Sequence, residues 1–306
     1  MTFRYKIFIF RTIIVLGVIL AGFITFKIAT RKGISWSNVN GRKIAHLVIN
    51  DAPGVSIRLA NCKNDTIEYC HVANGKGIAI VLYNCTGIVI QKDTIYNVPA
   101  GVLATDCRDI KVNDNVMKNM TRTRYHADFV QFDNVNGAGN RILRNKCQDD
   151  YGHSNAEDAI NLYKSNGVKG DSILIMGNQI RGGGPSKTGG GIMLGDEGGS
   201  YQSARNNILV NPGQYGMAVS GGTGMNISDN QIYSARFFYS NVGLYYHNYS
   251  KFPSSDVTMA RNKIKWINGT VGGSNTWFPD FIPKGANTNI LNANIGNNLL
   301  PDPLVK

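Results

Sequence analysis

The sequence is poor in charge, and the charge that it has is unevenly placed. Only 17% of its 306 residues are charged, and the first 43 residues hold eight Lys or Arg and no acidic residue. The remaining chain holds 24 basic and 20 acidic residues, so most of the formal net charge of +12 belongs to the N-terminus. A nucleic-acid-binding protein carries its basic excess on the folded body, so this distribution argues against a nucleic-acid partner.

A signal-peptide cleavage motif is lacking after the N-terminal hydrophobic run. The run is uninterrupted from Thr12 to Phe26, and it begins at Ile7 if Arg11 is tolerated. A spanning helix needs about 20 apolar residues, whereas the apolar region of a signal peptide needs roughly 7–15. We expect residues 1–32 to form a hydrophobic helix that is a signal-anchor or a signal peptide. Either interpretation makes the body extracytoplasmic, membrane-anchored or secreted.

Helical periodicity is lacking in the body of the chain, where a short apolar strand recurs instead. The strand is usually entered through glycine, and its second residues are Ile78, Val102, Val130, Ile160, Ile192, Met217 and Leu244. The successive gaps are 24, 28, 30, 32, 25 and 27 residues, and "IRL" at Ile57 belongs one unit earlier. Period-two alternation with abundant Val, Ile, Gly and Asn favours strands over helical repeats.

A second set of recurring positions alternates with the first. Each is an Asn or Asp followed closely by a small apolar residue: Asp93, Asn115, Asn145, Asn178, Asn207, Asn230 and Asn262. One unit therefore contains at least two strands and a turn marked by Asn. Asn tolerates unusual backbone angles at a turn, and its amide can bond the Asn of the next coil.

Internal periods of this size predict a stacked-repeat architecture. In a parallel β-helix each coil pairs with the next about 4.8 Å away, and equivalent residues stack in columns. We expect a β-helix domain over residues 33–270. The ends of such a stack need caps, for which the C-terminal tail over residues 271–306 is natural material.

The two interleaved ladders resemble those of the right-handed parallel β-helix proteins, the pectin-lyase-like superfamily, over roughly residues 43–270. With the general preference for right-handed crossovers, the resemblance implies an all-β, single-stranded right-handed parallel β-helix (solenoid) with an N-terminal hydrophobic helix. It implies no single activity, because lyases, hydrolases, epimerases and non-catalytic adhesins share the fold. The Trp-x-Asp-His signature of pectate lyases is absent. Of the Tyr-x-x-Asp-Pro-His motif of mannuronan C5-epimerases, only Tyr125 and Asp128 match.

The five cysteines lack metal-ligand spacing. Cys62, Cys85 and Cys107 follow an Asn or Asp in matched contexts, with gaps of 23 and 22 residues, so we expect them to stack in one column. Stacked neighbours lie within the Cα range of a disulfide. A ladder of buried free thiols and a bonded column therefore both remain open.

The three longest units gather polar side chains on one face. Aligning Val130 with Ile160 and Ile192 places Asp128 beside Asp158 and then Gly190. Three further columns follow from this alignment: Gln131 with Asn161 and Met193, Asp133 with Tyr163 and Gly195, and Asn134 with Lys164 and Asp196. Strand alternation points the Gln131 and Asp133 columns away from the core.

The extra residues of these units precede the strand each time, in segments that begin at Thr121, Gln148 and Arg181. Loops at one corner of consecutive coils predict a wall beside the polar face, and hence a groove suited to a polysaccharide. Basic residues in the loops would meet the carboxylates of an acidic sugar. The predicted substrate-binding residues are Arg122, Arg124, Gln131, Asn161, Tyr163, Arg181, Lys187 and Asp196.

Asp128 and Asp158 are the centre of the predicted chemistry. Two stacked carboxylates repel, so they share a proton, bind a cation such as calcium, or pair with a base. Neutralising a uronate and removing its C5 proton is lyase or epimerase chemistry, whereas two carboxyl groups about 5–9.5 Å apart serve a hydrolase. Alternatively, the two aspartates only cap a corner by bonding backbone N–H groups.

We therefore expect a lyase or epimerase acting on a uronate-containing glycan, with a hydrolase and a non-catalytic glycan-binding scaffold as alternatives. The candidate catalytic residues are Tyr125, His126, Asp128, Asp133, Glu157, Asp158 and Lys164. Calcium at Asp128 and Asp158 is the one candidate cofactor. The expected partners are a polysaccharide and, through the N-terminal segment, a membrane. We expect the protein to be a monomer.

Overall fold

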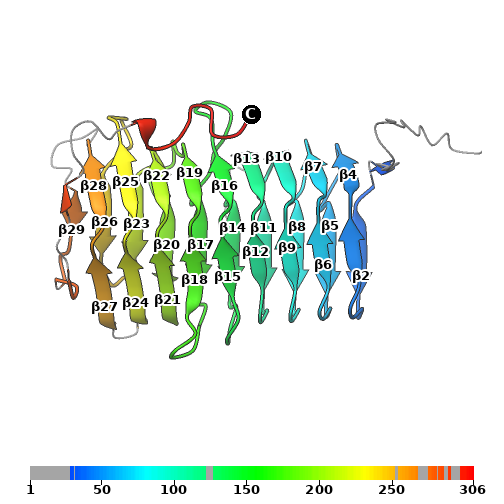
Figure 1. Ribbon diagram of the computed structural model, residues 1–306, viewed down its shortest axis with the longest axis horizontal. Coiled ribbons are helices and arrows are strands. Elements are labelled where there is room, and N and C mark those ends of the chain that lie inside the picture. The colour runs from blue at the N-terminus through cyan, green and yellow to red at the C-terminus, as the bar shows by residue number, and fades with distance from the viewer. Residues whose placement is uncertain are drawn as a thin grey trace, which may run out of the picture.

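The protein is built almost entirely from parallel strands, as its computed structural model shows (Figure 1). The structure describes residues 28–30, 32–121, 127–251, 254–267, 275–280, 282–285, 289–290 and 297–306. Within these ranges the single helical element is a 3-10 turn, η1 (Asn297–Leu299), and no helix is long and apolar enough to cross a membrane. The N-terminal hydrophobic run, Thr12–Phe26, lies outside the described residues.

A complete coil contributes one strand to each of three parallel sheets. The first sheet contains β1 (Ile28–Thr30), β4 (Leu47–Asn50), β7 (His71–Ala73), β10 (Thr94–Val98), β13 (Val116–Met120), β16 (Lys146–Gln148), β19 (Gln179–Arg181), β22 (Ile208–Val210), β25 (Gln231–Ser234), β28 (Lys263–Trp266) and β30 (Asn289–Ile290). The second contains β2 (Ile34–Ser37), β5 (Ile57–Ala60), β8 (Ile80–Tyr83), β11 (Val102–Thr105), β14 (Val130–Asp133), β17 (Ile160–Tyr163), β20 (Ile192–Asp196), β23 (Tyr215–Val219), β26 (Val242–Tyr246) and β29 (Thr276–Trp277). The third contains β3 (Lys43–Ala45), β6 (Thr66–Glu68), β9 (Val89–Gln91), β12 (Lys111–Asn113), β15 (Arg141–Leu143), β18 (Ile173–Met176), β21 (Ser200–Arg205), β24 (Thr223–Ser228) and β27 (Ser255–Ala260).

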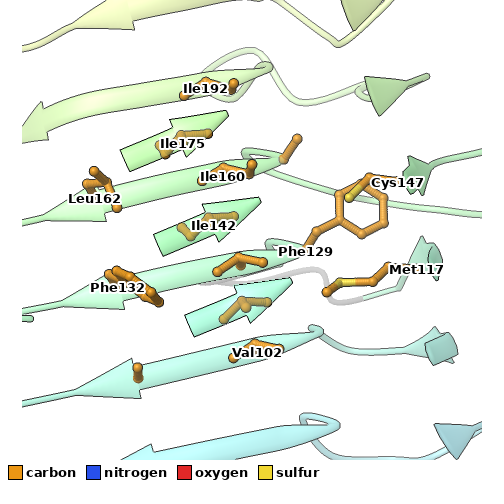
Figure 2. Packing of buried hydrophobic residues seen from close by; sticks show 14 of the residues in the cluster. Val102, Met117, Phe129, Phe132, Ile142, Cys147, Ile160, Leu162, Ile175 and Ile192 are labelled. Carbon is orange, nitrogen blue, oxygen red and sulfur yellow. The ribbon is translucent and has the colours of Figure 1, made fainter. Parts of the chain in front are cut away.

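The core is the stack of inward side chains between these sheets. Val130 pairs with Ile160, and Ile160 with Ile192, as the alignment of the repeats predicted. Val102 belongs to the same column. Figure 2 shows Val102, Ile160 and Ile192 in register, with the Phe129 ring directed toward Met117 and Cys147. Because β-branched side chains fit the pleat and fill the space between sheets, burial of these columns stabilises the coil.

One member of the first ladder was assigned wrongly. Val102 pairs with Ile80, whereas the repeat spacing aligned it with Ile78. The entry glycine, Gly77, marks the corner, since a Cβ there would lie 2.4 Å from the backbone of Gly54. The strand itself starts later, so glycine locates the close backbone approach and leaves the strand register open.

The asparagine ladder is confirmed at the corner between the third and first sheets. The Nδ2 atom of Asn115 donates to Oδ1 of Asn145 at 3.0 Å, and that of Asn145 donates to Asn178 in the same way. The bonds continue through Asn207, Asn230 and Asn262. The positive φ angle, however, belongs to the residue before each ladder position, such as Asp114 at 57°. The ladder asparagines are selected for their amides and not for unusual backbone angles.

The cysteine column is also confirmed, and its thiols are free. The backbone N–H of Cys62 donates to Sγ of Cys85 at 3.4 Å, and that of Cys85 donates to Sγ of Cys107 at 3.3 Å. All five cysteines are buried and unbonded. The column therefore acts as core packing with weak sulfur acceptors at a corner.

The C-terminal residues 297–306 run back across the outer face of the first sheet (Figure 1). Leu300 and Val305 are buried there, and the Val305 N–H donates to Oε1 of Gln148 at 2.7 Å. This part of the predicted capping tail thus covers the side of several coils.

Candidate functional site

A cleft of about 360 Å³ opens on the outer face of the second sheet, over β14, β17 and β20. It is lined by Asp128, Gln131, Glu157, Asp158, Asn161, Tyr163, Thr188, Met193 and Asp196. Seven of these nine side chains are among the predicted site residues; Thr188 and Met193 are the additions. The three enlarged coils therefore bring the predicted polar cluster together in one place.

Strand register explains why these residues meet. Gln131 pairs with Asn161, and Asn161 pairs with Met193, in a column that points away from the core. The loops that precede the strands carry Asp128, Glu157 and Thr188 to the same corner, because each connects the first sheet to the second. The cleft is thus formed by one column of outward side chains, from Gln131 to Met193, and by the loops that precede these strands.

Asp128 and Asp158 stack as the alignment predicted, and both bond backbone amides. The N–H of Asp158 donates to Oδ1 of Asp128 at 3.0 Å, and the N–H of Gly190 donates to Oδ1 of Asp158 at 2.8 Å. This is the predicted corner cap. It accounts for one oxygen of each carboxyl group and leaves the other free to contact the cleft or a side chain.

Asp158 is surrounded by donors. The Tyr215 hydroxyl donates to Oδ1 of Asp158, and Nδ2 of Asn161 donates to its Oδ2 at 3.0 Å. Gly190 makes room for this contact, since a Cβ there would lie 2.7 Å from the Tyr215 ring. Burial raises the pKa of Asp158 to about 7, while the bonds from Tyr215 and Gly190 act to lower it.

Asp128 is the member of the pair whose ionised form is the more strongly disfavoured. Burial raises the pKa of Asp128 well above its usual range, and the charge of Asp158 raises it further. Asp128 is 3% exposed and Asp158 is 4% exposed, yet both line the cleft. Because two close carboxyl groups in one low-dielectric site do not readily ionise together, burial and repulsion raise the pKa of Asp128 well above its usual range, whereas the donors around Asp158 limit the rise of its pKa.

A bulge in β20 places Asp196 differently from the alignment. Asp196 pairs with Tyr163, where Gly195 had been predicted, because the register shifts between Asn161 and Tyr163. Gly195 takes a φ of 67°, which suits glycine. Asp196 thereby reaches the cleft, where its Oδ2 accepts from Nδ2 of Asn161 at 3.0 Å. The expected stacking of Asp196 on Lys164 is wrong, and Lys164 instead lies over the Tyr163 ring.

Hydrogen-bond acceptors dominate the cleft. Asn161 is 8% exposed, and its Oδ1 has no hydrogen-bond partner among the described residues. Four carboxyl groups line the cleft, from Asp128, Glu157, Asp158 and Asp196, whereas its lining includes no Lys or Arg within the described ranges. A ligand that fills the cleft must therefore bring donors.

The other predicted residues lie elsewhere. Asp133, Lys164 and Lys187 are absent from the lining of the cleft as the described residues form it. Arg181, predicted to bind substrate, lies on the first sheet and pairs with Asp302 of the C-terminal tail. The predictions for Arg122, Arg124, Tyr125 and His126 fall outside the described residues.

Tyr215 is a residue of the candidate site that the sequence analysis did not identify. It belongs to β23, two coils beyond Asp158, and stands directly before Gly216, the entry glycine of a later repeat. The available signal was Gly190, the empty position in the Asp128–Asp158 column, which leaves space for a ring from a neighbouring coil. Nothing in the spacing named the ring that fills it.

The described part of the chain contains no group of three or more His, Cys, Asp or Glu side chains arranged to hold a metal ion. Oδ1 of Asp128 and Oδ1 of Asp158 already accept backbone N–H groups. Calcium at Asp128 and Asp158 stays a prediction.

Comparison with known proteins yields one family and several solved structures. Residues 24–146, less than half of the chain, match the family described as periplasmic copper-binding protein (NosD). No curated protein matches the chain. The tailspike protein gp49 from Pseudomonas phage LKA1 is similar at 10% identity and a TM-score of 0.25, over 89% of this chain and 50% of that one.

A tailspike protein variant of E. coli bacteriophage HK620, in complex with a pentasaccharide, is similar at 10% identity and a TM-score of 0.20. That match covers 88% of this chain and 72% of the tailspike. The chain spans half the length of the LKA1 tailspike. The assignment of the fold rests instead on the register of the chain's own strands. By that register, the chain has the architecture of the parallel β-helix proteins, as the interleaved ladders of its sequence predicted.

Proposed function

We propose that the cleft binds a glycan without carboxylate groups and hydrolyses it between paired carboxyl groups. The observation that carries this proposal is the Asp128–Asp158 pair. Burial keeps a proton on Asp128, while Tyr215, Gly190 and Asn161 direct donors at Asp158. Two titratable groups whose environments push their pKa values apart supply the acid and the base of a hydrolase.

The two carboxyl groups divide the work of hydrolysis. Asp128 gives its proton to the leaving glycosidic oxygen as the bond to the anomeric carbon breaks. The Asp158 carboxylate bonds that carbon, and water later displaces it while Asp128 takes back a proton. Stacked coils lie about 4.8 Å apart, which is nearer to the roughly 5–5.5 Å of retaining enzymes than to the roughly 6.5–9.5 Å of inverting ones. Retention of configuration is therefore expected.

The charge of the cleft is the reason to prefer a glycan without carboxylates. Elimination and epimerisation both need the uronate carboxylate beside the reacting carbon to be neutralised, and a cation does this most strongly. The described lining offers four carboxyl groups and no such cation. Sugar hydroxyl groups, by contrast, are donors for the carboxylate oxygens that line the cleft. A lyase or epimerase would depend on residues such as Arg122 and Arg124.

Copper, which the name of the matching family mentions, does not fit the described residues. Within the matched range, Cys62, Cys85 and Cys107 are buried, and two of the three thiols accept backbone N–H groups. The described residues hold no cluster of three potential ligands. No step of the proposed reaction involves copper.

The proposed location is extracytoplasmic. The same family name carries the word periplasmic, and the N-terminal hydrophobic run of this chain is long enough for an anchor or a signal peptide. A polysaccharide is a natural substrate in that compartment.

The test is to incubate the full chain with neutral, amino-sugar and uronate polymers, and to assay reducing ends and the ultraviolet absorbance of unsaturated sugars. We expect new reducing ends from a polymer without carboxylates, with loss of that activity in Asp128→Asn and Asp158→Asn. Either Asn keeps the oxygen that accepts the backbone N–H, so both variants should fold. Asp51→Asn, at an exposed turn far from the cleft, is the matched control.

Other outcomes would reassign the site. Unsaturated products from a uronate polymer would replace the hydrolase by a lyase. Glycan binding without any product, unchanged in both variants, would make the protein a non-catalytic scaffold.

A further inference from the structure

The outward column that lines the cleft continues along the second sheet toward its C-terminal end. Met193 pairs with Ala218, Ala218 with Tyr245, and Tyr245 with Trp277, one residue per coil. Figure 1 shows β20, β23, β26 and β29 as successive strands toward that end of the solenoid. At about 4.8 Å per coil, the four steps from Asn161 to Trp277 span about 19 Å.

An apolar floor joins the cleft to this column. Met193, Tyr215, Ala218 and Val242 form a buried cluster that is separate from the core, and Tyr245 packs against it. The rings of Tyr215 and Tyr245 meet edge to face, with their centroids 5.2 Å apart, and Ala218 belongs to the same cluster. The four clustered side chains are at most 7% exposed, so they support the cleft and Tyr245 from beneath. Contact with a ligand falls to the cleft lining and to the more exposed rings beyond.

An aromatic patch, formed by Tyr245, His247, Tyr249 and Trp277, lies at the end of the floor. Trp277 is 46% exposed and Tyr249 is 60% exposed. The ring of Trp277 lies 6.1 Å from that of Tyr245 and 5.5 Å from that of His247, and Tyr249 packs edge to face on His247 at 4.2 Å. The patch is therefore continuous.

Hydrogen bonds hold His247 and the backbone beside it in place within the patch. Nδ1 of His247 lies 3.0 Å from Oδ1 of Asp280, and Oδ2 of Asp280 accepts the Asn248 N–H at 2.6 Å. A preformed surface loses little side-chain freedom on binding. Exposed rings held in this way are typical of ligand-binding surfaces.

We infer that the aromatic patch is a second sugar-binding subsite, occupied by the same glycan chain whose cleaved residue sits in the cleft. The apolar C–H faces of a sugar pack on the faces of Trp277 and Tyr249, while its hydroxyl groups remain in water. The distance of several coils makes the substrate a polymer of several sugars. This inference rests on the proposed occupancy of the cleft by a glycan, but it concerns binding and needs no turnover.

The test measures how binding depends on chain length. The probes are glucose, galactose and N-acetylglucosamine oligomers, from disaccharides to octasaccharides, titrated into the full chain by calorimetry. For the series that binds, affinity should rise with length until the chain reaches Trp277. In Trp277→Ala the longest oligomers should lose about ten-fold in affinity and the disaccharide should lose none. Trp277→Phe, which keeps an aromatic face, should recover most of that loss.

Controls separate this inference from the proposed function. Tyr69→Ala removes an exposed ring between the third and first sheets and should leave the length series unchanged. Asp158→Asn should lose turnover and keep the length series. The inference is overturned if Trp277→Ala and Tyr249→Ala keep the length dependence of the unmodified protein, or if no length dependence exists, whatever the turnover.

Discussion

Two corners of the enlarged coils are closed by side chains that accept a backbone N–H from a neighbouring coil. At the corner between the third and first sheets, the acceptor is a neutral amide, as where Asn145 accepts from Asn115. At the corner between the first and second sheets, Asp128 and Asp158 accept with carboxyl groups, and the donor N–H belongs to the coil that follows. The amide also donates, so it bonds the next coil, whereas an ionised carboxylate offers only acceptors.

Because the asparagine ladder closes its corner with amides, a carboxyl group is not needed for that purpose. Burying one raises its pKa and costs solvation, which the amide avoids. The carboxyl groups of Asp128 and Asp158 are buried at a corner that faces the cleft, whereas the ladder amides are buried at a corner away from the cleft. Asp93 is the informative intermediate, since it is a carboxyl group inside the sealed ladder, and burial raises its pKa to about 7.

The largest effect is expected from placing a carboxylate in the sealed ladder. Asn145→Asp keeps the acceptor for Asn115 but removes the donor to the Val112 carbonyl and to Asn178. The buried charge then faces two oxygens, so the free energy of unfolding should fall by about 3 kcal/mol near neutral pH. Chemical denaturation measures this loss. Asn64→Asp, in the exposed Asn64–Asn40 pair, is the control, and its free energy of unfolding should change little. Equal losses in both variants would show that burial of the ladder does not disfavour a carboxylate.

The reverse exchange should stabilise the protein. Asp93→Asn supplies an amide that can donate to Asn115, as Asn115 donates to Asn145, and it removes a buried oxygen that has no partner among the described residues. Because burial raises the pKa of Asp93 from 3.8 to about 7, the folded state holds this proton more tightly than the unfolded state. Stability from this group is thus complete below the ordinary pKa and is lost as the pH rises to about 7.

Above that pH, Asp93→Asn should raise the free energy of unfolding by about 2–4 kcal/mol, and at low pH it should change little. Urea denaturation across the pH range measures both values. A pH-independent difference between the two proteins would mean that Asp93 does not titrate as its burial implies.

The smallest effect is expected at the cleft, where a hydrogen bond from Tyr215 acts on the pKa of Asp158. Tyr215→Phe keeps the ring and removes the hydroxyl group that donates to Asp158. Since that bond favours the ionised form, its loss should raise the pKa of Asp158 by about one unit. If Asp158 must be ionised for turnover, the acidic limb of the pH–rate profile moves upward by the same amount. Tyr83→Phe, exposed on the same sheet, is the control; an unchanged limb in Tyr215→Phe would remove Tyr215 from the mechanism.

Much of the fold follows from the repeats, because stacking turns sequence period into spatial position. The columns of Val130 and Ile160, of Asn115 and Asn145, and of Asp128 and Asp158 were all predicted in this way. Where the chain departs from the period, the prediction failed. Val102 pairs with Ile80 and not with Ile78, because the entry glycine marks the corner of the coil and does not fix the register of the strand.

The site departs from the period in the same way. A bulge at Gly195 brings Asp196 into the cleft. The spacing of the repeats in the sequence does not reveal such a bulge. Arg181 forms an ion pair with Asp302, which lies 121 residues later in the C-terminal tail. Arg181 is therefore not the cation that was predicted to line the cleft. Such contacts join segments that no repeat relates.

By itself the sequence determined the stack, its inward columns and the place where carboxyl groups gather, since these are local patterns repeated at a regular interval. Tertiary structure alone decided which donors surround Asp158, which carboxyl group keeps its proton and how far the outer face extends toward Trp277. Those properties depend on the burial and electrostatic field created by neighbouring coils, and a side chain acquires them only when the coils close around it.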